Sequence, residues 1–113
     1  MGKAIGMIEF KTVSSGVVAA DHMVKTSDVE LIEAETVCPG KYIAIIAGDL
    51  SAVDAAVNNA IAQSGENLID SFVLGNPHES IFPAIYGTTH LEKVRALGIL
   101  ETFDAAAIIQ AAD

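Results

Sequence analysis

The chain has 113 residues, 51% of them hydrophobic, and 15 acidic against 6 basic side chains give it a formal net charge of -9. Nucleic acid and anionic membrane surfaces repel so acidic a protein, which excludes both as partners. No apolar run reaches the roughly 18 residues of a membrane-spanning helix. The single cysteine and the lack of a signal-peptide pattern favour a reducing, cytosolic compartment. We expect the excess of hydrophobic side chains to be buried in contacts between subunits.

A strand and a helix are predicted at the start of the chain. Residues 4–11 form an apolar run with β-branched and aromatic side chains, which is typical of a strand. Helical periodicity follows over residues 14–26, where Ser14 or Ser15 is placed to cap the first turn. The face of this helix predicted to be buried carries Val17, Ala20 and Val24.

A hairpin with cysteine at its tip is predicted next. Residues 29–37 and 42–48 read as two strands, and the second is apolar on both faces, as a central strand should be. Cys38-Pro39-Gly40-Lys41 joins them. Proline in second place and glycine in third suit a type II turn, because glycine accepts the positive backbone angle required there.

The remaining elements complete an α+β domain. Asp49 or Ser51 is placed to cap a second helix, and residues 67–74 supply a fourth strand. The order strand, helix, strand, strand, helix, strand predicts a ferredoxin-like split βαβ fold, with an antiparallel four-stranded sheet and helices packed on it. A short extra helix is predicted over residues 77–85. The buried stripe of the second helix is predicted to be Val53, Val57, Ala60 and Ile61.

The chain then repeats its own beginning. Ala4-Ile-Gly-Met-Ile-Glu9 returns as Ala96-Leu-Gly-Ile-Leu-Glu101, and residues 19–21 return as 111–113, at a constant offset of 92 residues. An ungapped repeat of this kind indicates a duplicated unit. We therefore predict a complete domain at 1–87, with 88–113 as a linker and the first strand and partial helix of a second, truncated unit. We expect 92–113 to dock on the first domain, to exchange with a neighbour or to be poorly ordered.

Residues with catalytic or metal-binding chemistry are sparse. The histidines lack the sequence spacing of zinc ligands; they are His22, His78 and His90. We expect them to lie at the surface or at subunit interfaces. Glutamates at 30, 33 and 35 belong to one strand, where the first points away from the other two, so a solvated strand face is the simpler interpretation. These patterns predict a protein that is not an enzyme.

Cys38 is the exception. A free cysteine is usually a small buried hydrophobe, but one that begins a Pro-Gly turn is exposed with its loop, and Lys41 nearby favours the thiolate. One thiolate holds no cluster or metal ion by itself. Three copies meeting on a symmetry axis would offer three soft ligands, which suit an iron-sulfur cluster or a soft metal.

Several motifs in order resemble the bacterial microcompartment shell proteins. They are Ala4-Ile-Gly-Met-Ile-Glu9, Ala20-Asp-His-Met-Val-Lys25, Cys38-Pro-Gly-Lys41, Gly48-Asp-Leu-Ser-Ala-Val53 and Asn76-Pro-His78. The resemblance covers nearly the whole chain. Together with Asp70-Ser-Phe-Val-Leu74 and the 92-residue repeat, it points more narrowly to the tandem-domain shell proteins of propanediol-utilisation compartments.

This resemblance implies a structural role in the bacterial cytoplasm. Such proteins form six-sided tiles, as trimers of tandem chains or hexamers of single units, and pack with other shell proteins around enzymes. The resemblance implies that the hairpin loop lines a central pore and that Cys38 contributes to a [4Fe-4S] cluster shared between subunits, with a redox enzyme as a partner. The implied pore loop is Val37, Cys38, Pro39, Gly40 and Lys41. The implied tile edge is Lys25, Asn76, Pro77 and His78.

Two alternatives stay open at this point. For the tile edge, Lys25 also fits an ordinary solvated helix residue. Many single-domain members carry arginine where this chain has Asn76, so the hydrogen bonds made by that arginine are not implied here.

For the function, ferredoxin-like folds also host small-molecule sensors and small hydrolases, so the fold does not choose among these functions. A sensory domain would bind a ligand at a subunit cleft, whereas a hydrolase needs a nucleophile with a base in reach.

Overall fold

The computed structural model describes residues 3–113, so the first two residues of the predicted domain lie outside the described range. Its elements follow in the order β1 (Ala4–Phe10), α1 (Val13–Thr26), β2 (Glu30–Val37), β3 (Lys41–Gly48), α2 (Leu50–Ser64), a 3-10 turn (Gly65–Asn67), β4 (Leu68–Leu74), α3 (Ile81–Ile85) and α4 (Ala105–Ala112). The four strands form one antiparallel sheet in the order β2-β3-β1-β4. This is the predicted α+β split βαβ arrangement, and the short extra helix is present as α3.

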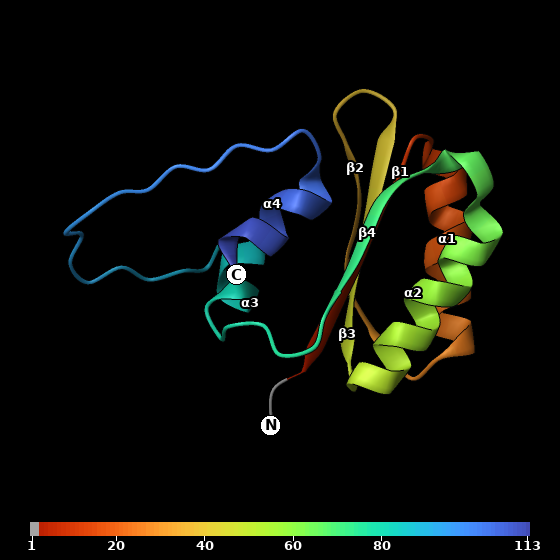
Figure 1. Ribbon diagram of the computed structural model, residues 1–113, viewed down its shortest axis with the longest axis horizontal. Helices are drawn as coiled ribbons and strands as arrows, with labels where there is room; N and C mark the ends of the chain where they lie inside the picture. Colours follow the sequence, from red (N-terminus) through yellow and green to blue (C-terminus); the bar gives the residue numbers. More distant parts are fainter. Residues whose placement is uncertain (1–2) are drawn as a thin grey trace.

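The sheet lies between two helical layers (Figure 1), with α1 and α2 on one face and α3 and α4 on the other. The central strand β1 is buried along its whole length, because helices cover both of its faces. One face of β1 contributes Ala4, Ile8 and Phe10 to the core under α1 and α2. The other contributes Ile5 and Met7 to the core under α3 and α4. We call this second side the open-side face.

Helix α1 differs from the prediction in its cap and in its buried face. Thr12, not Ser14 or Ser15, caps the helix, and its Oγ1 accepts a hydrogen bond from the Ser15 amide at 3.4 Å. Ala20 is buried as predicted, but Val17 and Val24 are 50% and 39% exposed. The buried face carries Gly16, Ala19, Ala20 and Met23 instead. Three of the four are small because α1 lies close to the sheet, and at Gly16 a Cβ would overlap the ring of Tyr42.

The second helix and the hairpin agree more closely with the prediction. Asp49 occupies the N-cap position of α2, although its side chain makes no capping hydrogen bond. Val53, Val57 and Ala60 are buried, and Ile61 packs at the margin of the same core. In the hairpin, Gly40 adopts a φ of 84°, the positive angle expected for its place in the turn.

The repeated segment behaves differently in its two copies. Helix α4 begins at Ala105, which is 92 residues after Val13 at the start of α1, so the helix boundary follows the repeat. The segment 96–102, which corresponds to the whole of β1, has no regular secondary structure and is exposed, so the predicted strand is not formed. A strand needs a hydrogen-bonding neighbour, and none lies beside it in the described part of the chain. Within 92–113, only α4 docks, since it packs on the open-side face, whereas residues 92–103 are exposed.

Among residues 3–113, no helix is both long enough and apolar enough to cross a membrane.

Candidate functional site

The tip of the β2–β3 hairpin is the first candidate site. Val37 and Lys41 face each other as the last paired residues of the two strands, which leaves Cys38, Pro39 and Gly40 as an exposed three-residue loop. Figure 1 shows this loop projecting past the ends of the neighbouring helices. Cys38 itself has a φ of 48°, in the left-handed region that side chains with a Cβ rarely adopt. The thiol is exposed, as the sequence predicted.

Cys38 has no companion ligands in its own chain. Within the described residues, no group of three histidine, cysteine or acidic side chains is arranged to hold a metal ion. A single chain therefore supplies one soft ligand at most. An exposed thiol at a projecting tip is nevertheless free to approach the same thiol in other copies, so its geometry fits a ligand shared between subunits.

The residues of the implied tile edge do not form one cluster. Lys25 lies in the last turn of α1 and its Nζ is 2.8 Å from Asp21 Oδ2, in an exposed ion pair. Asn76, Pro77 and His78 lie in the loop between β4 and α3, where Pro77 is buried and the other two are exposed. The His78 amide donates to Asp113 Oδ1 at 2.7 Å. No hydrogen bond joins Lys25 to this loop in the described part of the chain.

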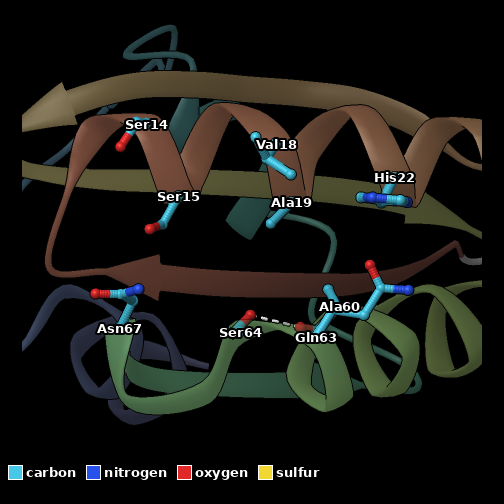
Figure 2. A pocket seen from close by; sticks show the side chains of 9 residues that line it. All are labelled: Ser14, Ser15, Val18, Ala19, His22, Ala60, Gln63, Ser64 and Asn67. Carbon is cyan, nitrogen blue, oxygen red and sulfur yellow. Dashed lines mark hydrogen bonds between the residues drawn. The ribbon is translucent and has the colours of Figure 1, made fainter.

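A groove between α1 and α2 could receive a small ligand (Figure 2). It is lined by Ser14, Ser15, Val18, Ala19, His22, Ala60, Gln63, Ser64 and Asn67. It contains serines and a histidine, the residue types of a hydrolase. However, Ser15 Oγ accepts a hydrogen bond from Thr12 Oγ1 at 2.8 Å, and Ser64 Oγ donates to the Ala60 carbonyl. None of the three serines is hydrogen-bonded to His22 in the described part of the chain, so the groove shows no activated nucleophile.

Glu9 is an interaction site that the sequence reasoning missed. Its side chain is 2% exposed, and its Oε1 accepts hydrogen bonds from the amides of Ala105 at 3.0 Å and Ala106 at 3.1 Å. The carboxylate thus binds the positive end of α4 and holds that helix on the open-side face. Two signals in the sequence could have identified it: it is the one acidic residue in an apolar strand, and it recurs as Glu101.

The fold and the site together define a class of protein: a split βαβ domain with an exposed hairpin tip and no assembled catalytic centre among residues 3–113. Residues 4–77 match the BMC domain model. The chain therefore belongs to the BMC domain family. It is 35% identical over 88 residues to the carboxysome shell protein CsoS1 of Prochlorococcus marinus, an alignment that covers 75% of this chain and 85% of that protein.

Two longer relatives match the whole chain. The bacterial microcompartment shell protein PduT of Citrobacter freundii is 42% identical over 113 residues, covering 100% of this chain and 61% of that protein. The crystal structure of a microcompartment protein from Desulfitobacterium hafniense is 42% identical with a TM-score of 0.87, covering 100% of this chain and 63% of the other. The chain thus spans about three-fifths of the length of these relatives. The resemblance to microcompartment shell proteins is confirmed.

Proposed function

We propose that the chain is a structural, non-enzymatic shell protein of a bacterial microcompartment in the bacterial cytoplasm, where it forms tiles with copies of itself and with other shell proteins. The observation that carries this proposal is a match along the full chain to a microcompartment shell protein. The serines of the α1–α2 groove make no hydrogen bond to His22 in the described part of the chain, which also fits a structural role, because assembly buries apolar surface without requiring reactive side chains.

The finer part of the proposal concerns the hairpin tip. In a tile, the loops from Val37 to Lys41 would surround a pore on the symmetry axis, and Cys38 from three chains would hold a [4Fe-4S] cluster. The exposed thiol at a projecting tip supports this arrangement. When bound, such a cluster would supply one-electron transfer across the shell, with a redox enzyme as the natural partner, or would itself be the cargo. Lys25 and the loop 76–78 would lie at the contacts between neighbouring tiles.

Native mass spectrometry of the wild-type protein, purified without oxygen, tests both parts. We expect a trimer or hexamer that carries the added mass of four irons and four sulfides. A Cys38→Ser variant should form the same oligomer without iron, because serine preserves the size of the side chain and removes the soft ligand. A variant that retains iron would overturn the ligand assignment. A wild-type protein that stays monomeric and instead binds a small molecule saturably in the α1–α2 groove would favour a sensory domain over a shell tile.

A further inference from the structure

One aromatic side chain holds the base of the β2–β3 hairpin. Tyr42 directly follows Lys41, the first residue of β3, and only 9% of it is exposed. Its side chain lies in the core under α1 and α2. In the sheet it pairs with Phe10 on β1 and with Thr36 on β2, so it joins the hairpin to the central strand. Aromatic side chains that pair across neighbouring strands stabilise the pairing.

Helix α1 reaches this ring through a glycine. A Cβ at Gly16 would lie 2.5 Å from Tyr42 Cγ and 2.7 Å from Tyr42 Cβ, so any other residue would overlap the tyrosine side chain. Gly16 is not one of the glycines with a positive φ, so its backbone conformation alone does not require glycine. Glycine makes a helix less stable than alanine does, and the close approach of Tyr42 is the physical reason for its presence in α1.

The tip of the hairpin has no comparable support. Cys38, Pro39 and Gly40 are exposed, and outside the strand pairing no backbone hydrogen bond joins them to other parts of the described chain. A strand rises about 3.3 Å per residue, so a small tilt of the hairpin at Tyr42 becomes a larger displacement at the tip. The direction in which Cys38 projects therefore depends on how the base is held.

We propose that Tyr42 is the positioning residue of the hairpin tip and that Gly16 holds it in place. The ring, packed against Gly16 and beside Phe10, sets the tilt of the hairpin and with it the direction of the Cys38 thiol. This inference rests on the proposed function only in giving that direction a use, because three thiols reach one cluster only when their loops converge. The packing itself needs no assembly, and it lies on the side of the sheet opposite α4.

The test exchanges side-chain size across this contact in the 113-residue chain. Gly16→Ala places a methyl group where the ring lies, and Tyr42→Leu removes the ring and leaves room for that methyl group. Tyr42→Phe keeps the ring and serves as the conservative variant. Gly6→Ala is the matched control for overpacking, because its Cβ would meet Val57 and Val53 under α2 instead of Tyr42.

Two measurements report on the tip. Cys38 is the one cysteine of the sequence, so a nitroxide label reports on it alone, and the line shape of the label in electron paramagnetic resonance gives the mobility of the tip in the chain without iron. Iron per chain after anaerobic reconstitution shows whether the thiols still converge. Circular dichroism and urea denaturation check that each variant folds and measure how much stability it has lost.

We expect Gly16→Ala and Tyr42→Leu each to make the label more mobile and to weaken iron loading about ten-fold, as the loss of a residue that orients a metal ligand typically does. The double variant should recover part of both, because leucine makes room for the added methyl group. Tyr42→Phe and Gly6→Ala should match the wild type in both measurements, although Gly6→Ala is less stable.

Wild-type mobility and iron in both Gly16→Ala and Tyr42→Leu would overturn this inference and leave the shell function standing. Equal effects in Gly6→Ala would also overturn it, because they would show a response to lost stability and not to the base of the hairpin. A wild type without iron would overturn the cluster assignment, and the label would still decide the role of Tyr42. Should Gly16→Ala fail to fold, Tyr42→Leu against Tyr42→Phe decides.

Discussion

At the scale of single residues, the hairpin tip holds an unusual backbone conformation. The Pro-Gly sequence accounts for the positive φ of Gly40 but not for the φ of 48° at Cys38. The left-handed conformation costs an L-residue with a Cβ about 1–2 kcal/mol. The cysteine therefore occupies a position that glycine would adopt more readily, which is compatible with selection for its thiol.

Replacing Cys38 tests this strain. Cys38→Gly should be more stable than Cys38→Ala by about 0.5–1 kcal/mol. Glycine removes the free-energy cost of the left-handed conformation, and this gain exceeds the free-energy cost of glycine's greater entropy in the unfolded chain. Both variants lack the thiol, so they differ only in the Cβ. Urea denaturation followed by circular dichroism measures the difference. Equal stability would show that the loop relaxes to a negative φ in solution.

Gly6 is a second residue whose side chain is restricted, here because packing leaves no room for a Cβ. A Cβ there would lie 2.7 Å from Val57 Cγ2 and 2.8 Å from Val53 Cγ1, because α2 approaches β1 closely. Gly6→Ala should lower the free energy of unfolding by about 1–3 kcal/mol through overpacking. Gly75→Ala is the matched control, since its Cβ would meet Leu50 at an ordinary 3.5 Å. Chemical denaturation of both variants measures this, and equal losses would contradict the packing argument.

At the scale of elements, the position of α4 depends on one carboxylate. Glu9 supplies the acceptor for the first two amides of α4, while Ala106 and Ile109 supply the apolar contact. A helix of eight residues is too short to be stable alone, so it persists because the sheet and Glu9 hold it.

We expect Glu9→Gln to release α4 partly. The loss of charge weakens two hydrogen bonds and the interaction with the helix dipole, a cost of about 1–3 kcal/mol for docking. Hydrogen exchange of the amides in 105–112 should quicken at least ten-fold, whereas those of β1 and β3 should keep their protection. Glu66→Gln, at an exposed position in the 3-10 turn before β4, is the control. Unchanged exchange in α4 would show that apolar packing alone holds the helix.

At the scale of the whole molecule, α4 covers apolar surface that would otherwise be open. The open-side face contains Met7, Ile45 and Phe72, all buried while α3 and α4 lie upon it. Exposure of so large an apolar patch promotes association. This face is therefore the part of the domain most dependent on what the chain supplies after residue 87.

A chain shortened to residues 1–87 should self-associate more strongly than the 113-residue chain, because removal of α4 exposes apolar side chains of the open-side face. Sedimentation velocity at matched concentrations measures the shift toward larger species. A shortened chain that remains monomeric and folded would contradict this account of the face.

The sequence predicted most of the fold, because local periodicity carries the necessary information. Alternating strands and helices, the Pro-Gly turn at residues 39–40 and the N-cap position at Asp49 are all local features. The repeat likewise predicted a partial helix near residue 113, and α4 is that helix; its start lies 92 residues after the start of α1, although the sequence reasoning did not identify the capping residue of either helix. The exposure of Cys38 followed from the turn by the same reasoning.

Only the tertiary structure decided which faces meet. The valines and the small residues of α1 both fit helical spacing, and the closeness of the sheet selected the small ones for burial. The segment 96–102 has the composition of β1 but is not a strand, because hydrogen bonds to a neighbouring strand, and not sequence, complete a sheet. The partnership of Glu9 with α4 joins residues nearly a hundred positions apart, a contact that no local pattern encodes.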